Sequence, residues 1–223
     1  MKDFLRLASI LLVLIPLLVG GRSAHGQVEF FGWTLRESAY PLDHIIRRGQ
    51  DTSICEPGVM VSYRGTALRY SSPIRVHPAF RERLPEFERV ASEVASEIYG
   101  RAPHRVLHSG AYNCRPIRGR RDRLSEHALG NALDVRGFEF RPLPRRASAP
   151  LDFPRPLRRA FTVTLDRHWE ANGVTGDVHR RFLRELVRRL AEEDVFRVIY
   201  GPAHPGHRNH FHFDMSPFRW IHV

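Results

Sequence analysis

The sequence of 223 residues predicts a single α+β domain, built on one mainly antiparallel sheet with flanking helices. Two segments carry apolar residues at helical spacing, and several shorter runs are rich in β-branched and aromatic residues. The two kinds of segment do not alternate strictly along the chain, as they would in a parallel α/β fold. The chain is also long enough to bury one substantial core.

Two amphipathic helices are predicted. Residues 85–100 place apolar side chains at helical spacing between Pro85 and Gly100, two residue types that are frequent at the start and the end of helices. Residues 178–193 combine a stripe of leucine, valine and phenylalanine with an arginine-rich face. Each helix therefore has one face to bury.

The predicted strands are short runs of residues that favour an extended backbone. They cover residues 59–63, 105–109, 132–135, 161–165, 196–200 and 210–215. The segment 141–159 is rich in proline and arginine, and this composition predicts an exposed loop.

The chain shows no internal repeat. We expect a signal peptide at residues 1–26, an N-terminal arm with short strands at 27–76, and the main domain at 77–223. The first segment has a basic start, an apolar run over residues 7–19 and small residues before a cut after Gly26. An uncleaved membrane anchor is the alternative, but the run is shorter than the roughly 20 residues that a spanning helix needs. We therefore expect a secreted protein with no stable membrane span once the signal is removed.

The composition is strongly basic, with a formal net charge of +11 at pH 7. A basic exported protein is attracted to polyanions such as wall polymers and lipid headgroups. No nucleic-acid-binding motif accompanies the charge, so nucleic acid is not an expected partner. The two cysteines, Cys55 and Cys114, both lie in the exported part, and an oxidising compartment favours a disulfide between them. A two-cysteine metal site would need a closer spacing.

The segment HRNHFHFD near the C-terminus concentrates potential metal ligands. Strand alternation would place His210, His212 and Asp214 on one face and turn the two intervening phenylalanines into the core. Two imidazoles and a carboxylate would then share one surface.

A second segment, SEHALGNALD, ends at Asp134. In it, Gly130 lets the backbone turn or approach a neighbour closely, and Ala132 leaves room beside Asp134 for another ligand. Two histidines and one carboxylate, with a fourth position left for water, describe a catalytic zinc site. Manganese or iron could occupy the same ligands.

The pattern SxHxxGxAxD, followed far downstream by HxH, resembles the LAS metallopeptidases, which are named for lysostaphin, D-Ala-D-Ala carboxypeptidases and sonic hedgehog. Within that group, YNCR at residues 112–115, LSEHALGNALDV at 124–135 and HFHFD at 210–214 are most similar to the bacterial extensin-like C-terminal domain family. The resemblance implies a LAS or hedgehog-like zinc peptidase core and a place in the bacterial cell envelope, periplasmic or extracellular.

The resemblance also implies roles for individual residues. His127, Asp134 and His212 would hold one zinc ion per chain. His210, the first histidine of HxH, would act as a base or would stabilise the tetrahedral intermediate. Arg115 would hold a substrate carboxylate or the developing oxyanion, and a structural salt bridge is its alternative role.

Three further residues complete the expected set. His207 resembles an extra histidine that shortly precedes HxH in murein endopeptidases of the group. Ser125 and Asp214 would orient the ligand histidines. Glu126 is an alternative base, although its place next to His127 on an extended chain would turn it to the opposite face.

The function expected from these residues is hydrolysis of peptide bonds in peptidoglycan, in its cross-links or its stem peptides, by endopeptidase or carboxypeptidase action. The alternative is a zinc-containing but non-catalytic module that binds the cell wall, as hedgehog signalling domains are thought to keep zinc without turnover. His210 and Arg115 favour the enzyme, because a module without turnover has no need of them. A basic wall-adhering protein without metal is the third possibility.

Overall fold

The structure is a computed structural model that describes residues 28–30, 33–35, 55, 57–147, 150 and 153–223. The predicted signal peptide lies outside the described residues. No helix within the described ranges is long and apolar enough to cross a membrane.

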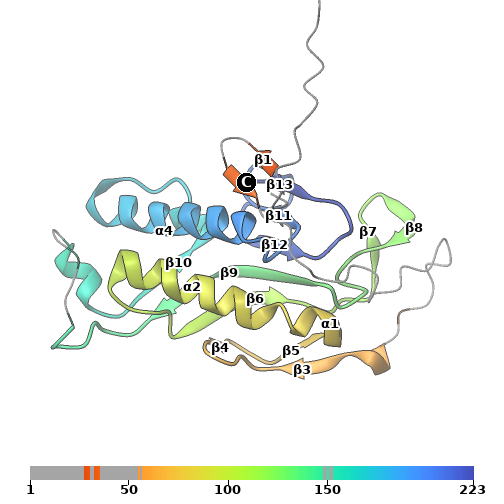
Figure 1. The fold of residues 1–223 in the computed structure, drawn as a ribbon, viewed down its shortest axis with the longest axis horizontal. Coiled ribbons are helices and arrows are strands. Elements are labelled where there is room, and N and C mark those ends of the chain that lie inside the picture. The colour runs from red at the N-terminus through yellow and green to blue at the C-terminus, as the bar shows by residue number, and fades with distance from the viewer. Residues whose placement is uncertain (1–27, 31–32, 36–54, 56, 148–149, 151–152) are drawn as a thin grey trace, which may run out of the picture.

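A seven-stranded sheet forms the centre of the molecule (Figure 1), and it confirms the predicted α+β class. Its strands follow the order β13-β11-β12-β9-β6-β4, and β10 also pairs with β9. The β4–β6 and β11–β13 pairs are parallel, and the other four pairs are antiparallel. The strands are β4 (Arg69–Tyr70), β6 (Arg105–Gly110), β9 (Ala132–Phe140), β10 (Phe161–Thr164), β11 (Val198–Tyr200), β12 (Phe211–Asp214) and β13 (Trp220–His222).

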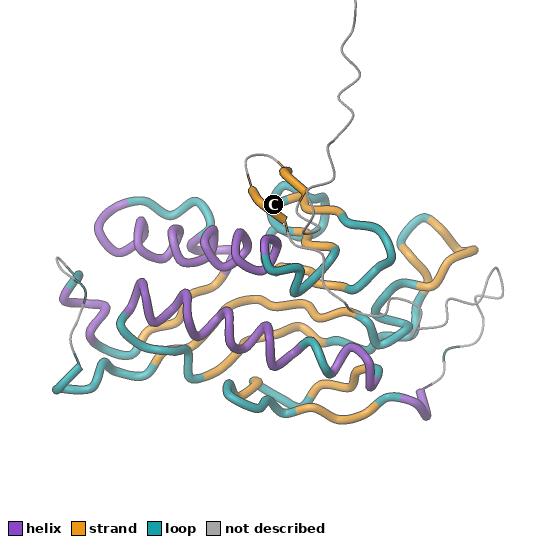
Figure 2. Tube along the Cα trace, in the orientation of Figure 1, coloured by secondary structure: helices purple, strands orange, loops and turns teal. Residues whose placement is uncertain are grey.

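Two long helices, α2 (Leu84–Tyr99) and α4 (Gly173–Glu192), pack side by side against the sheet, as the traces in Figures 1 and 2 show. Phe87 of α2 and Phe182 of α4 both contact the ring of Phe138 in β9, which places the two helices on the same face. Two single-turn helices, α1 (Pro78–Arg81) and α3 (Leu165–His168), precede them along the chain.

The helix boundaries show what the apolar pattern could predict. The helix α2 matches the predicted segment within one residue and ends before Gly100, whose φ of 69° is the left-handed conformation common after a helix end. The helix α4 begins at Gly173, five residues before the prediction. Its first turn contains glycine and the 77% exposed Val174, so no apolar periodicity marks it.

Strand boundaries differ from the prediction in two places that concern the site. The strand β9 runs on to Phe140 instead of stopping at Val135, because both Phe138 and Phe140 are buried beneath the helices. The strand β12 begins at Phe211, so His210 lies just before the strand and not within it.

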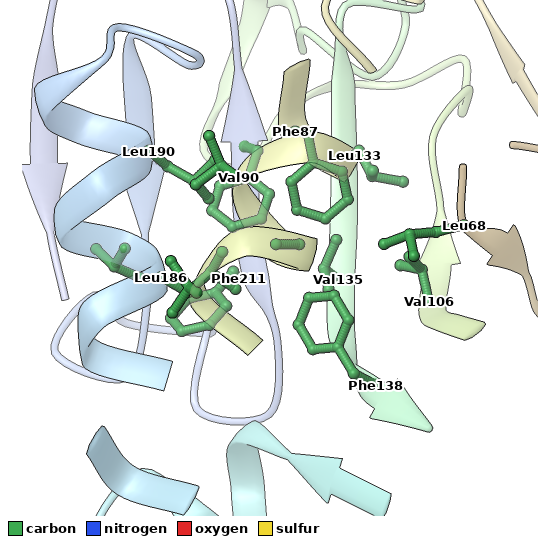
Figure 3. Close-up of a cluster of buried hydrophobic side chains, with 14 of the residues drawn as sticks. Leu68, Phe87, Val90, Val106, Leu133, Val135, Phe138, Leu186, Leu190 and Phe211 are labelled. Atoms are coloured by element: carbon green, nitrogen blue, oxygen red, sulfur yellow. The ribbon is translucent and has the colours of Figure 1, made fainter. Parts of the chain in front are cut away.

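The core lies between this sheet and the two helices (Figure 3). It includes Phe87 and Val90 of α2, Leu186 and Leu190 of α4, and Phe211 of β12, all nearly inaccessible to solvent. Burial of each such side chain contributes about 1.5–3 kcal/mol to folding. This rigid layer fixes the positions of the strands that carry the polar site.

Part of the predicted N-terminal arm packs against the same core. The strands β3 (Val61–Tyr63) and β5 (Ile74–Val76) pair with each other, and a separate hairpin is formed by β1 (Val28–Phe30) and β2 (Trp33–Leu35). A short 3-10 turn, Pro57–Val59, occupies the start of the run that was predicted as a strand from residue 59.

The segment 141–159, which was predicted as an exposed loop, is anchored in the part of it that the structure describes. Leu157, within the 3-10 turn Arg155–Arg158, is 3% exposed, and Phe153 is 8% exposed. The arginines around them remain exposed. The predicted exposure is therefore right for the arginines and wrong for Phe153 and Leu157. The proline-rich composition gave no signal that these two side chains are buried.

Candidate metal centre

The sheet brings the two histidine-containing segments together. Asp134 in β9 and His212 in β12 are direct partners in the strand register. His127 lies in the turn of residues 125–131 that leads into β9. Residues far apart in sequence thus meet at one end of β9.

Three ligand atoms converge on one point. His127 Nε2, Asp134 Oδ1 and His212 Nδ1 form a triangle in which every side is 3.1 Å. The same three residues form a group whose donor atoms could hold a metal ion. Zinc bonds of 2.0–2.1 Å in a tetrahedral arrangement correspond to ligand separations of about 3.3–3.4 Å. The triangle is slightly tighter than this spacing, and its three donor atoms could hold a metal ion.

Outer hydrogen bonds fix which ring nitrogens face the centre. His127 Nδ1 lies 2.5 Å from the backbone oxygen of Ala111, and His212 Nε2 lies 2.8 Å from Asp214 Oδ2. A carbonyl and a carboxylate only accept, so these two nitrogens are the donors. In the neutral rings, both inward nitrogens therefore present lone pairs to Asp134. A cation between them satisfies all three atoms.

The electrostatics of this triad also favour positive charge. Burial opposes ionisation of Asp134, but the hydrogen bonds that His127 and His212 donate when their inward nitrogens are protonated outweigh burial and lower the pKa of the carboxyl. Burial likewise lowers the pKa of His212, yet its hydrogen bonds with Asp134 and Asp214 outweigh that effect and raise the pKa to about 9. A proton on His212 or a divalent metal ion supplies the positive charge that this position attracts.

The triad is open to solvent on one side. The side chain of His127 is 5% exposed, whereas those of Asp134 and His210 are 19% and 17% exposed. His210 Nε2 lies 3.7 Å from Asp134 Oδ1, and His210 Nδ1 lies 2.8 Å from Asn209 Oδ1. With Nδ1 donating to the asparagine, the lone pair of Nε2 is available on the open side.

His207 lines the same side. Its ring centre lies 4.9 Å from that of His210 and 5.8 Å from that of His212, and its Nδ1 donates to the backbone oxygen of Pro205 at 3.1 Å. Burial lowers the pKa of His207 to about 4, so the ring is neutral at pH 7. The ring of Tyr200 stacks 5.6 Å from that of His212 and forms another wall of the site.

Arg115 lies near the triad in the chain but does not contact it. Its guanidinium is exposed, and within the described structure its one hydrogen bond is a long contact of 3.5 Å with the backbone oxygen of Pro116. No salt bridge of Arg115 is present among the described residues, so the predicted structural alternative has no support there.

Ser125 and Glu126 support the turn that carries His127. Ser125 Oγ accepts a hydrogen bond from the backbone N–H of His127 at 3.3 Å, so it holds the backbone and not the ring. The carboxylate of Glu126 accepts a hydrogen bond from the side chain of the buried Asn131.

Gly130 closes this turn in a conformation that requires glycine. Its φ is 64°, and a Cβ atom there would lie 2.2 Å from the sulfur of Met60 and 2.7 Å from the backbone nitrogen of His77. The predicted close approach is confirmed. The approaching chain comes from the N-terminal part of the molecule, which thereby supports the ligand turn.

The predicted disulfide is present between Cys55 and Cys114, with Cα atoms 5.9 Å apart. It ties the N-terminal segment to the loop that supplies the carbonyl of Ala111. In the same loop, the backbone N–H of Asn113 donates to the backbone oxygen of His127 at 3.0 Å. The crosslink therefore stiffens the chain directly beside the triad.

The sequence did not reveal two of these supporting contacts. The partner of His127 is a backbone carbonyl, for which residue types carry no signal. Asn209 had an available signal, since an amide directly before HxH is well placed to hold the first histidine.

Comparison with known families supports part of the resemblance. Residues 37–145 match the family described as "Extensin-like protein C-terminus". The matched segment includes Cys55, Cys114, His127 and Asp134 and ends before the HxH motif, which the sheet places against it. Comparison with curated proteins and with solved structures gave no significant match.

Proposed function

We propose that this chain is a secreted zinc peptidase of the LAS group that hydrolyses peptide bonds in peptidoglycan. The observation that carries the proposal is the convergence of three metal-ligand atoms at 3.1 Å from one another, with His210 beside them on the open side. The extensin-like match over residues 37–145 supports a shared architecture around the first ligand segment.

The ligand set suits zinc chemistry. His127, Asp134 and His212 would hold the ion, while Ala111 and Asp214 keep the two rings in the required tautomers. Bound zinc supplies a Lewis acid that polarises a peptide carbonyl and lowers the pKa of water to about 7. Three protein ligands leave room for water and substrate.

His210 is the proposed base. Its Nδ1 is engaged by Asn209, and its Nε2 faces the open side of the triad. It would take a proton from the attacking water and return it to the leaving amine. His207, whose ring borders His210, would position substrate or assist that transfer.

Arg115 would complete the enzyme by binding a carboxylate of the substrate or the developing oxyanion. Its exposed guanidinium is available for an anion. Peptidoglycan stem peptides carry such carboxylates next to the bonds that a peptidase would cut. The predicted export and the strongly basic composition agree with a polyanionic substrate in the envelope.

A non-catalytic module that binds the cell wall and keeps zinc is the second candidate. The exposed position of Arg115, without contact to the triad among the described residues, favours it. In that case the zinc would stabilise the fold, and the wall would be bound without turnover.

Mass spectrometry of muropeptides released from sacculi separates these candidates. We expect wild type to release new muropeptides, and we expect chelator treatment and the His210→Ala variant to suppress the release. Zinc should remain bound to His210→Ala, because His210 is not among the three ligands. A zinc-loaded wild type that leaves sacculi and D-amino-acid peptides intact at several pH values would refute the peptidase and favour the binding module.

A further inference from the structure

A strongly basic hairpin stands next to the metal centre. It consists of β7 (Pro116–Ile117) and β8 (Arg120–Leu124), joined by a tight turn in which Gly119 has a φ of 80°. Residues 115–123 contain five arginines and one aspartate. Sequence patterns did not predict this hairpin.

Four of these arginines carry positive charge that no described side chain neutralises. Their side chains are exposed and form no ion pair with any side chain that the structure describes; they are Arg115, Arg118, Arg120 and Arg123. Like charges gathered on one hairpin repel one another, so they do not stabilise it. No contact among the described side chains accounts for this cluster.

The base of the hairpin is fixed to the metal centre. Ala111 and Asn113, just before it, hydrogen-bond to His127. The backbone N–H of Ser125, just after it, donates to the backbone oxygen of Arg115 at 3.1 Å. The disulfide at Cys114 adds a covalent tie. An anionic chain held by the hairpin would thus lie beside the triad in a set position.

We propose that the β7–β8 hairpin is a docking arm that binds the carboxylates of peptidoglycan stem peptides and leads the peptide to the metal centre. The inference rests on the proposed function, which makes a peptide the substrate. A guanidinium group can donate two parallel hydrogen bonds to a carboxylate. Several neighbouring arginines could therefore bind several stem-peptide carboxylates of one glycan strand. Among the large apolar residues that the structure describes, Ile117 is the only exposed one on the hairpin. One exposed apolar side chain is too little for insertion into a lipid layer.

A second basic segment provides a matched control. Arg145, Arg146 and Arg158 are also exposed, and they follow β9 at its other end. Along β9, Asp134 and Phe140 are separated by about 20 Å at 3.3 Å per residue. Figure 1 shows the hairpin and this segment at opposite ends of the molecule. Arginine-to-glutamine changes at either place remove the same charge.

The test measures co-sedimentation with sacculi stripped of attached phosphate polymers. The full chain carries His210→Ala throughout, so that digestion does not remove the ligand. The triple variant Arg118→Gln, Arg120→Gln, Arg123→Gln is compared with Arg145→Gln, Arg146→Gln, Arg158→Gln. We expect the hairpin variant to bind about tenfold more weakly and the control less than about twofold. Circular dichroism verifies that both variants fold.

Chemical blocking identifies the anion. Amidation of the sacculus carboxyls should reduce binding of the His210→Ala protein to that of the hairpin variant, and raised salt should do the same. Equal losses in the two triple variants, or unchanged binding to amidated sacculi, would overturn the docking arm. Tighter binding to polyphosphate or to phosphatidylglycerol vesicles than to stripped sacculi would also overturn it.

The outcome is separable from that of the proposed function. Hairpin-dependent binding together with intact muropeptides in the wild-type assay would retain the docking arm and reject the peptidase. Muropeptide release by wild type, together with equal binding of the two triple variants, would retain the peptidase and reject the docking arm.

Discussion

Arginine is abundant both on α4 and on the β7–β8 hairpin, but its surroundings differ. On α4, four of the five arginines pair with carboxylates of the same helix or of neighbouring segments, and the exposed Arg181 is the exception among the described side chains. The pairs are Arg180 with Asp177, Arg184 with Glu170, Arg188 with Glu185 and Glu192, and Arg189 with Glu97. On the hairpin, the four exposed arginines have no ionic partner among the side chains that the structure describes.

The difference shows that net charge is not an even property of this surface. The helical side pairs most of its arginines with carboxylates, which is typical of a solvated structural face. At the end of the sheet that carries the triad and the hairpin, the polar atoms of the triad face a common point, and the exposed arginines of the hairpin face solvent. We expect changes at that end to alter binding and chemistry, and changes on the helical side to alter stability.

The largest expected effect is the loss of metal in Asp134→Asn. Removal of one charged ligand should abolish zinc retention after dialysis and reduce muropeptide release at least about a hundredfold, since even partners of metal ligands contribute ten- to a hundredfold. Asp177→Asn makes the same chemical change on α4, where the side chain is 53% exposed, and should retain both properties. Equal losses in the two variants would break the distinction between the two regions.

The helical side should respond to acid through His179. This buried residue of α4 lies 2.9 Å from the hydroxyl of Tyr99, and burial lowers its pKa to about 4, with a smaller contribution from the nearby His168. The unfolded chain, with an ordinary histidine pKa near 6.5, therefore binds the proton first. The contribution of neutral His179 to the free energy of unfolding is therefore fully present above about pH 6.5. It falls by up to about 3 kcal/mol as the pH drops to about 4.

Urea unfolding of wild type and His179→Gln between pH 4 and pH 7.5 measures this contribution. The wild-type curve should lose more stability on acidification than the curve of the variant. Parallel pH profiles would show that His179 does not contribute.

Glu88 of α2 should contribute to stability alone. It is fully buried, and its carboxylate accepts hydrogen bonds from the hydroxyl of Tyr63 at 2.7 Å and from the backbone N–H of Leu68 at 3.0 Å. Glu88→Gln should lower the free energy of unfolding by about 2–3 kcal/mol, because hydrogen bonds to a charged acceptor are lost. The exposed Glu86→Gln on the same helix is the control, and zinc content should be unchanged in both. Loss of zinc in Glu88→Gln would contradict a purely structural role.

The smallest effect tests the comparison of the two arginine groups directly. Arg188→Gln removes two ion pairs on α4 and should lower the free energy of unfolding by about 0.5 kcal/mol. Arg118→Gln on the hairpin should leave it unchanged or raise it slightly, because it relieves repulsion. Chemical denaturation with replicate curves resolves the sign of the difference. A destabilised Arg118→Gln would indicate a structural role for the hairpin charge.

Residue patterns predicted the main helices, most strands, the disulfide and the two segments whose histidines and aspartate converge, because each rests on periodicity or on residue chemistry. They did not predict the supports of the site. The carbonyl of Ala111 is a backbone atom, and the β7–β8 hairpin is too short and too arginine-rich to resemble strands. His210 was placed within a strand because alternation continues through HxH, yet the ladder begins at Phe211.

The pairing of Asp134 with His212 depends on strand order. The sequence indicates that two segments contain candidate metal ligands but not that β12 lies beside β9. Strand order of this kind follows from packing of the whole core, so local residue patterns do not predict it.

Zinc content after dialysis, measured by elemental analysis of the purified wild type and of His127→Ala, tests the central claim most directly. The converging triad predicts about one equivalent of zinc in the wild type and almost none in the variant, with the fold retained. A wild-type protein that binds no zinc, or a His127→Ala protein that binds as much as the wild type, would contradict the metal centre.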